Sequence, residues 1–152
     1  EGIRTGVIKH ADHTFEIDHK GKDSYELRKA GARQRLIGSD KRWALMVEMN
    51  EGEKSDLDNM IEHLDKRSLD LILVEGFKPE QIPKIEIIRP ALGKPPLYPD
   101  DPDIIAIATD AELPDKTSLP ILDLNSPEDV SEFIIRHVMH DDHSRVAGNS
   151  KN

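Results

Sequence analysis

Apolar residues gather along the chain in short runs whose spacing predicts β-strands. The runs at residues 69–74 and 103–108 are almost continuously aliphatic, which is typical of strands buried on both faces of a sheet. Shorter runs predict further strands at residues 4–11, 84–89 and 121–124. Two more runs flank a polar turn and predict a β-hairpin with strands at residues 33–38 and 43–49.

Helical spacing of apolar residues marks the segments between these strands. It predicts helices at residues 25–30, at residues 55–64 and after Asn125-Ser126-Pro127-Glu128. Asp23 or Ser24 is expected to cap the first helix, and Gly31 to end it. Buried strands with interspersed helices indicate an α/β protein with a mainly parallel sheet and an inserted β-hairpin. We expect a single domain over residues 1–139 and a disordered tail over residues 140–152.

The predicted hairpin carries apolar residues on both of its faces. Leu45 and Val47 fall on one face, and Ala44 and Met46 on the other. A lone hairpin would leave one face in water, so we expect a second copy of the chain to cover it in a homodimer. Trp43 is expected in the core or at this interface rather than against the ring of a ligand.

The balance of charge narrows the possible partners. The formal net charge is −9, which argues against nucleic acid and anionic membranes, because both are bound through basic patches. An anionic small ligand stays possible, since a few N–H groups and one lysine can hold a phosphate. The sequence has no cysteine, which indicates a reducing compartment such as the cytoplasm. No apolar run approaches the roughly 18–20 residues that a membrane span needs.

Three predicted strands end in residues that can do chemistry, and in open α/β sheets ligands bind beyond such ends. The three ends are Lys9-His10, Glu75-Gly76 and Thr109-Asp110. Glu75 follows a hydrophobic strand as a Walker B carboxylate does, where it could hold Mg²⁺ or orient a water. The alternative is that Glu75 caps a helix or pairs with a lysine. Asp110 could accept hydrogen bonds from guanine, although a turn residue is the favoured interpretation.

Two polar segments offer further candidate sites. The loop with His10, Asp12, His13, Asp18 and His19 has metal-binding residue types, but its spacing favours a solvated loop, and Asp18 could instead reach the Mg²⁺ of a nucleotide. Lys22 and Asp23 stand at a predicted helix start, where an anion could bind, although ordinary capping explains them equally well. The C-terminal His137, His140 and His143, with Asp141 and Asp142, could bind a metal weakly but favour a frayed helix end.

Several familiar motifs do not occur in the sequence. It contains no GxxxxGK[ST], GxGxxG, HExxH or GxSxG, so a serine hydrolase or a metalloprotease has no support. The chain begins with Glu1-Gly2 directly before a strand, as a helix end feeding a strand would. We therefore expect its start to lie inside a larger fold.

Several segments taken together resemble the molybdopterin-guanine dinucleotide biosynthesis adapter (MobB) family. They are GVIKHADHTFEIDHKGKDSYELRKAGA at residues 6–32, RWALM at residues 42–46, LDLILVEGFK at residues 69–78, and the later KIEIIRP and IIAIATD. The resemblance runs from about Gly2 to Asp110. It implies a P-loop NTPase-type α/β fold with helices on both sheet faces, and a dimeric GTP-binding protein that assists a guanylyltransferase in joining GMP to molybdopterin.

The resemblance also implies roles for residues of this chain. Asp18 and Glu75 would lie near Mg²⁺ and the γ-phosphate of GTP, and Lys9, His10, Lys22 and Asp23 would line the cleft, with Gly76 allowing close approach. The family's strand, glycine-rich phosphate loop and helix would precede Glu1. We expect residues 1–152 alone to bind GTP poorly or not at all, with at most a weak GTPase activity, because that loop supplies the N–H cradle and the phosphate lysine.

Two other classes of function fit the same residues. One is a nucleotide-dependent metallochaperone or maturation factor that uses the histidines of residues 10–19. The other is a non-catalytic module that dimerises and docks on a transferase.

Overall fold

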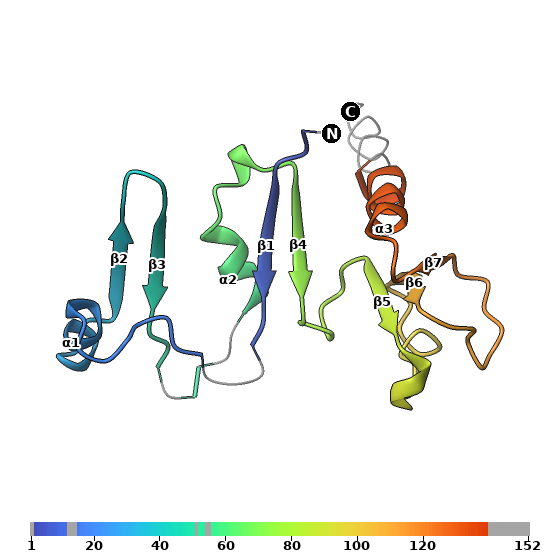
Figure 1. Ribbon diagram of the computed structural model, residues 1–152, viewed down its shortest axis with the longest axis horizontal. Coiled ribbons are helices and arrows are strands. Elements are labelled where there is room, and N and C mark those ends of the chain that lie inside the picture. The colour runs from blue at the N-terminus through green and yellow to red at the C-terminus, as the bar shows by residue number, and fades with distance from the viewer. Residues whose placement is uncertain (1, 12–14, 51, 54–55, 140–152) are drawn as a thin grey trace, which may run out of the picture. The chain divides into compact units, whose positions relative to one another are not determined.

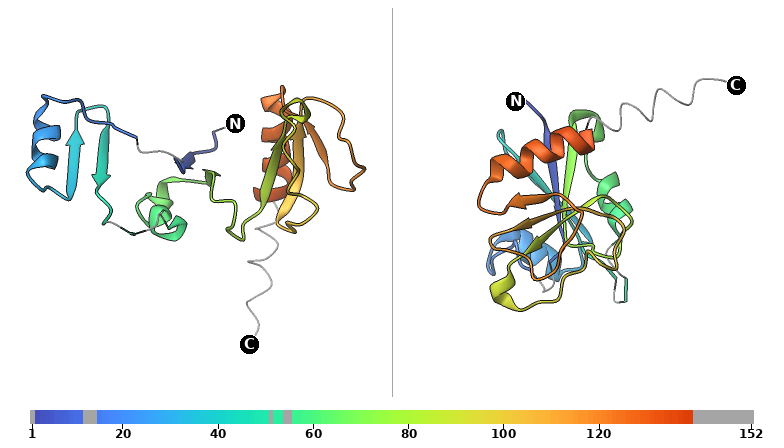
Figure 2. Two further views of the ribbon diagram at one scale, coloured as in Figure 1. Left: turned by 90° about the horizontal axis from the view of Figure 1, so that it is seen from below. Right: turned by 90° about the vertical axis from the view of Figure 1, so that its right-hand side faces the viewer.

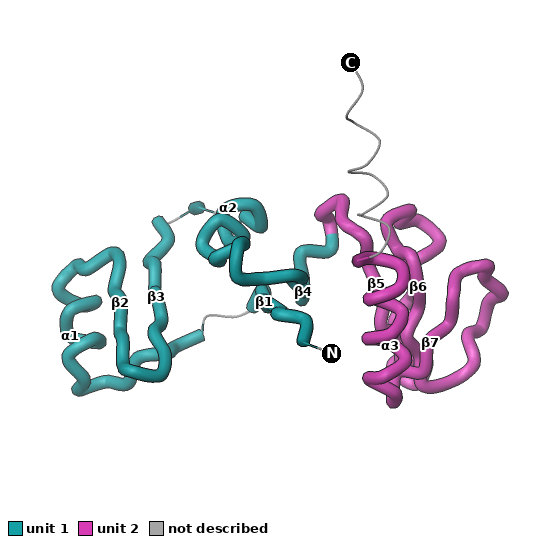
Figure 3. Tube along the Cα trace, turned by 90° about the horizontal axis from the view of Figure 1, so that it is seen from above, with its two compact units in different colours: residues 1–78 teal, residues 79–152 magenta. Residues whose placement is uncertain are grey.

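The computed structural model divides the chain into two compact units, residues 1–78 and 79–152 (Figure 3). It describes residues 2–11, 15–50, 52–53 and 56–139. A single domain over residues 1–139 stays a prediction. The expected tail, residues 140–152, lies outside the described residues. Within the described part of the chain, no helix has the length and apolar character that crossing a bilayer requires.

One part of the first unit is a pair of parallel strands, β1 (Thr5–Lys9) and β4 (Leu71–Glu75) (Figure 1). The helix α2 (Leu57–Glu62) and the short turn η1 (Lys66–Ser68) lie between them in the chain. Leu64 and Leu69 pack so closely on Gly6 that an added Cβ there would lie 2.7 Å from Leu69 Cδ1. The small residue therefore lets the segment after α2 approach the strand pair.

Strand β4 is less buried than its aliphatic sequence suggested. None of its five residues is fully buried, and Leu73 is 39% exposed. The expectation of burial on both faces is therefore wrong for β4. An aliphatic run indicates a strand, but the number of its faces that are buried depends on which elements pack against the strand.

A bidentate ion pair joins the starts of these two strands. Arg4 donates from Nε and Nη2 to the two carboxylate oxygens of Asp70, at 3.0 and 2.7 Å, and its backbone N–H donates to the same group at 2.9 Å. The guanidinium, through its hydrogen bonds and its charge, lowers the pKa of Asp70 to about 2. The pair therefore joins the residue before β1 to the residue before β4.

The rest of the first unit is a helix followed by the predicted hairpin. The helix α1 (Asp23–Lys29) precedes β2 (Gln34–Gly38), which pairs antiparallel with β3 (Trp43–Val47) (Figure 1). The expected cap at Asp23 or Ser24 is wrong: Lys22 has the extended backbone of the capping position, and its side chain makes no capping bond. Gly31, with φ of 103°, ends the helical turn as expected.

The second unit is a three-stranded parallel sheet with a helix against it. The strands β5 (Lys84–Ile88), β6 (Ile104–Thr109) and β7 (Ile121–Asp123) lie in the order β5-β6-β7. The helix α3 (Pro127–Ile134) contacts β7, buries Phe133 and continues as a π-helical turn, η3 (Ile135–Met139) (Figure 2). Ser126 caps α3 by accepting from the N–H of Asp129.

The middle strand of this sheet forms the core of the second unit. Residues 106–108 of β6 are at most 1% exposed, which confirms the sequence prediction of a buried strand there. The segment between β5 and β6 includes the short turn η2 (Pro90–Leu92). It is held by Glu86, whose carboxylate accepts from the N–H groups of Leu97 and Tyr98 at 2.7 and 2.8 Å. These elements confirm an α/β fold with mainly parallel strands and a separate antiparallel hairpin.

Candidate functional site

The ends of β1 and β4 bring three of the predicted site residues together. Lys9 lies opposite Glu75 in the parallel register, and its Nζ is 3.0 Å from Glu75 Oε1, so the lysine pairing that the sequence offered as an alternative is present. The next residue, His10, donates its backbone N–H to the carbonyl of Glu75 at 2.9 Å. The side chains of Lys9 and Glu75 are each about two-thirds exposed, so both can exchange partners with a ligand.

A strained turn follows Glu75 directly. Gly76 has φ of 92°, and Phe77 has φ of 52°, which side-chain-bearing residues rarely adopt. A Cβ on Gly76 would lie 2.8 Å from the Cβ of His10, so only glycine lets the two strand ends come this close. The ring of Phe77 meets the ring of His10 edge-on, with centroids 5.0 Å apart. Strain of this kind is concentrated at functional sites, which supports the prediction for Gly76.

Asp18 lies in a different environment from Glu75. Its side chain is 3% exposed, and its Oδ2 lies 3.1 Å from Nη2 of Arg35, which is 7% exposed. The same guanidinium contacts Glu48 at 2.9 Å, just after β3, and donates to the carbonyl of Ala32. In this arrangement Asp18 joins the loop before α1 to the hairpin, and its carboxylate is closed to a metal.

Lys22 and Asp23 lie where the sequence put them, at the start of α1. Both are exposed. Asp23 also lines a shallow hollow between α1 and the outer strand of the hairpin, together with Ser24, Leu27 and residues of β2. Close to it, Arg28 binds Glu16 at 3.1 Å and lies over the ring of Tyr25. Among the described residues, nothing in this geometry selects a phosphate, so the role of Lys22 and Asp23 in ligand binding stays a prediction.

Asp110 lies in the second unit, at the end of β6. Its Oδ2 accepts from Nη1 of Arg89 at 3.0 Å, and Arg89 follows the neighbouring strand β5. The preceding Thr109 closes the turn by donating from Oγ1 to the carbonyl of Ala111. This ion pair and the turn agree with the favoured interpretation of Asp110 as a turn residue, and recognition of guanine by Asp110 stays a prediction.

The two predicted Mg²⁺ ligands, Glu75 and Asp18, differ in whether their carboxylates can reach a metal ion. Glu75 offers an exposed carboxylate at a strand end, whereas Asp18 is enclosed by its pair with Arg35. Among the described residues, no three His, Asp or Glu side chains gather as a metal site would need. Asp12, His13, His140, Asp141, Asp142 and His143 lie outside the described residues, and His137 stacks on Phe133 with centroids 4.2 Å apart.

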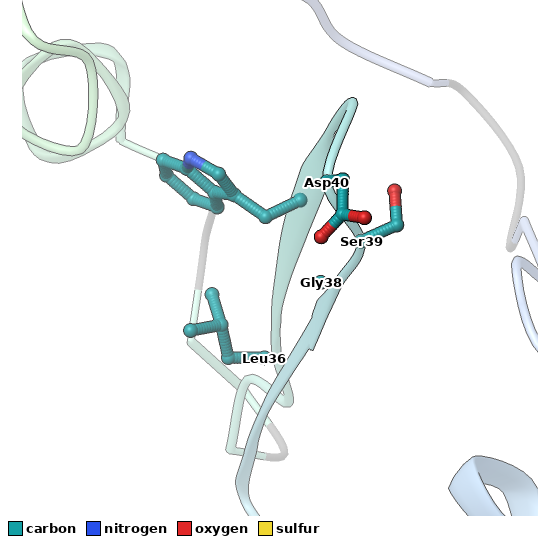
Figure 4. A pocket seen from close by; sticks show the side chains of 5 residues that line it. Leu36, Gly38, Ser39 and Asp40 are labelled. Atoms are coloured by element: carbon teal, nitrogen blue, oxygen red, sulfur yellow. The ribbon is translucent and has the colours of Figure 1, made fainter.

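The hairpin presents an apolar face that no described part of the first unit covers. We define the hairpin face as Leu36, Trp43, Leu45 and Val47, which are 68%, 66%, 40% and 41% exposed. The antiparallel register puts all four on one side, opposite the side that carries Arg35 and Met46. A shallow hollow at the turn end is lined by Leu36, Gly38, Ser39, Asp40 and Trp43 (Figure 4). Trp43 is therefore not buried within the first unit, and its role at an interface stays a prediction.

Sequence reasoning did not identify Arg35 and Phe77. The available signal for Arg35 was a charge in the middle of a strand, opposite an apolar Met46. For Phe77 it was the position directly after Glu75-Gly76, where a tight turn must carry the chain away from the strand end. Neither signal identifies the contact partner, which is Asp18 for Arg35 and His10 for Phe77.

Comparison with known proteins gives a consistent result. Residues 1–110 match the family model described as molybdopterin guanine dinucleotide synthesis protein B, MobB. The chain is 45% identical over 135 residues to the molybdopterin-guanine dinucleotide biosynthesis adapter protein of Escherichia coli (strain K12), covering 88% of this chain and 76% of that protein. It is 39% identical over 139 residues to the protein of the same name from Haemophilus influenzae, covering 91% and 75%.

Solved structures agree with these matches at the level of the fold. The crystal structure of Bacillus subtilis MobB superposes with a TM-score of 0.65 at 26% identity, covering 88% of this chain and 79% of that one. A MobB protein homolog from Bacillus stearothermophilus gives a TM-score of 0.64 at 21% identity, covering 91% and 80%.

Proposed function

This chain belongs to the molybdopterin guanine dinucleotide synthesis protein B family, and we propose that it is a GTP-binding adapter that assists a guanylyltransferase. The family fixes the process as the biosynthesis of the dinucleotide form of the molybdenum cofactor. The P-loop NTPase-type α/β fold of its relatives supports a nucleotide as the ligand. The partner enzyme would join GMP to molybdopterin, and this protein would bind the nucleotide and the enzyme.

The observation that carries the proposal is the exposed carboxylate of Glu75 at the end of β4, beside the exposed Lys9 at the end of the adjacent parallel strand β1. A carboxylate at this position suits the magnesium ion that accompanies a nucleoside triphosphate. Bound Mg²⁺ would neutralise charge on the phosphate oxygens, and Glu75 would hold it directly or through water. Lys9 would then turn from Glu75 to a phosphate oxygen, an exchange that costs little because both groups are exposed.

The remaining site residues take supporting roles in this proposal. His10 and Gly76 lie beside Glu75 and would line the site there, because Gly76 lets the two strand ends come close together. Lys22 and Asp23 would line the cleft, and Asp110 would read the guanine base after release from Arg89. The absence of cysteine supports the cytoplasm as the compartment in which the protein works.

We also propose that the protein forms a homodimer through the hairpin face. An uncovered two-stranded sheet with four exposed apolar side chains is unfavourable in water, and a second copy supplies a complementary apolar surface. Trp43 is the largest of the four side chains and the residue type most often central to interfaces.

Isothermal titration of the full-length protein with GTP tests the nucleotide proposal. We expect Glu75→Gln to weaken binding of GTP with Mg²⁺ about tenfold, the equivalent of roughly 1.4 kcal/mol, and to leave binding without Mg²⁺ unchanged. Glu80→Gln is the matched control, an exposed glutamate five residues further on. Absence of GTP binding by the wild-type protein would refute the proposal, and equal Mg²⁺ dependence of the two variants would refute the role of Glu75.

A further inference from the structure

An excess of positive charge is confined to one short stretch of this acidic protein. Residues 19–42 contain eight Lys and Arg against three Asp and Glu, whereas the rest of the chain contains 13 against 27. The stretch runs from the loop before α1 to the turn of the hairpin. Because attraction between exposed charges acts within about 8–10 Å, this stretch can attract an acidic group although the whole chain is acidic.

Part of this charge gathers at the end of α1. We define the basic surface as Tyr25, Arg28, Lys29 and Arg33. The guanidinium carbon of Arg28 and the ammonium of Lys29 lie 5.1 and 5.7 Å from the centroid of the Tyr25 ring. Gly31 ends the helical turn, so Arg33 lies close to the end of α1, directly before β2 (Figure 1).

Two of these cations are available to a partner. Arg28 binds Glu16 at 3.1 Å, whereas neither Lys29 nor Arg33 forms an ion pair with another residue of the described part of the chain. Both side chains are exposed. A cation in the last turn stabilises a helix, which accounts for Lys29 but not for Arg33, which lies beyond α1. The described fold therefore gives no reason for all of this charge.

The basic surface lies away from the hairpin face. Arg33 and Arg35 are two residues apart in an extended strand, so both point to the side of the hairpin opposite that face. Arg28 contacts the loop that covers the same side, because its partner Glu16 is two residues from Asp18, which pairs with Arg35. A second copy of the chain on the hairpin face would therefore leave the basic surface open.

We propose that the basic surface docks on an acidic surface of the partner guanylyltransferase. The inference rests on the proposed function, because that enzyme is the protein that an adapter must contact. Exposed cations opposite carboxylates speed association and select the partner. Tyr and Arg are residue types enriched at protein interfaces, and the half-buried ring of Tyr25 supplies apolar contact beside the two cations.

A protein surface suits this region better than a nucleic acid or an anionic membrane. Both of these polyanions extend beyond the basic surface, and they would meet the acidic remainder of the chain, with its 27 Asp and Glu. A protein can instead present a few carboxylates opposite Lys29 and Arg33 alone.

Binding of the full-length protein to the purified guanylyltransferase tests the inference. At about 50 mM salt, we expect Lys29→Glu with Arg33→Glu to lower the affinity about tenfold, mainly through slower association, and we expect added salt to bring the wild type toward the same affinity. A merely structural role would instead speed dissociation. Affinity for GTP should not change, because neither residue belongs to the proposed nucleotide site.

Lys66→Glu with Arg67→Glu is the matched control. It makes the same change of charge at two exposed residues of η1 in the same unit, and it should bind the enzyme as the wild type does. Equal affinities of the two double variants, or a wild-type affinity that salt does not change, would overturn the inference and leave the proposed function standing. A wild-type protein that binds neither the enzyme nor GTP would overturn both.

Other occupants of the basic surface give different results for the Lys29→Glu, Arg33→Glu variant. A shift from dimer to monomer in light scattering, with the affinity for the enzyme unchanged, would assign the surface to a second copy. Loss of binding to RNA or to phosphatidylserine vesicles, again with the affinity for the enzyme unchanged, would assign it to a polyanion. Either result would overturn the inference.

Discussion

Glu75 and Asp18 carry the same functional group in opposite surroundings. The carboxylate of Glu75 is 66% exposed and pairs with an equally exposed Lys9, whereas that of Asp18 is 3% exposed and pairs with a buried arginine. An exposed ion pair contributes about 0–1 kcal/mol, so Glu75 can change partners readily. Removing one partner of a buried pair costs about 3–5 kcal/mol, because the other charge is left unpaired, so Asp18 is expected to stay with Arg35.

The backbone at Gly76 gives the residue-scale prediction. We expect Gly76→Ala to destabilise the protein by more than the roughly 1–2 kcal/mol that a left-handed backbone costs an alanine, because the new Cβ also meets His10 at 2.8 Å. Urea unfolding measures the change. Gly21→Ala is the control, with a similar φ of 87° and no atom within 4 Å of the added Cβ. If the two variants lose the same free energy of unfolding, the contact with His10 does not contribute to the destabilisation.

At the scale of elements, the order of strands and helices followed from the sequence pattern. The hairpin, the buried strand β6 and the capped start of α3 agree with it, because alternation, aliphatic runs and Ser-Pro signals are local. The exposure of β4 and the burial of Arg35 could not be read from the sequence. Both depend on residues distant in the chain, as Asp18 is 17 residues from Arg35.

The same limit applies to the candidate site. Lys9, His10, Glu75 and Gly76 were predicted together, since the ends of neighbouring parallel strands meet at one edge. The arginine partners of the other two carboxylates were not predicted. Arg35 pairs with Asp18, and Arg89 pairs with Asp110. Pairing between side chains is decided by tertiary contacts that no local spacing encodes.

The Arg4–Asp70 pair gives the prediction at the scale of strand pairing. The pKa of Asp70 is about 2 in the folded protein, below the ordinary 3.8, so folding favours the ionised carboxylate. The stabilisation is therefore complete above about pH 4 and disappears as the pH falls toward 2. We expect Asp70→Asn to lower the melting temperature at pH 7 and to differ much less from the wild type near pH 2.5.

Thermal unfolding at the two pH values measures this effect. Asp65→Asn is the control, because Asp65 and Arg67 are 4.0 Å apart and largely exposed, and it should change the melting temperature little at either pH. A deficit of Asp70→Asn that is the same at pH 7 and pH 2.5 would contradict the assigned role of the ion pair.

At the scale of the whole molecule, the proposed function needs two surfaces. The strand ends of β1 and β4 are proposed to meet the nucleotide, and the hairpin face is proposed to meet a second copy of the chain. An adapter needs both a ligand site and protein contacts, and these two lie on different elements of the first unit.

Substitution of the hairpin face tests the homodimer. Burial of each large apolar side chain contributes about 2 kcal/mol, so Leu36→Ser with Trp43→Ser should shift the protein from dimer to monomer in light scattering. Leu92→Ser is the control, a leucine 63% exposed in the second unit. A wild-type protein that is monomeric, or a double variant that stays dimeric, would exclude the hairpin face as the interface.

The central claim is that the protein assists a guanylyltransferase through bound GTP. The most direct measurement is the yield of molybdopterin-guanine dinucleotide from purified guanylyltransferase, molybdopterin, GTP and Mg²⁺, with and without the full-length protein. We predict that the protein raises the initial yield several-fold and that the Glu75→Gln variant loses most of this increase. An identical yield with and without the protein, under conditions where the enzyme alone is active and limiting, would contradict the account.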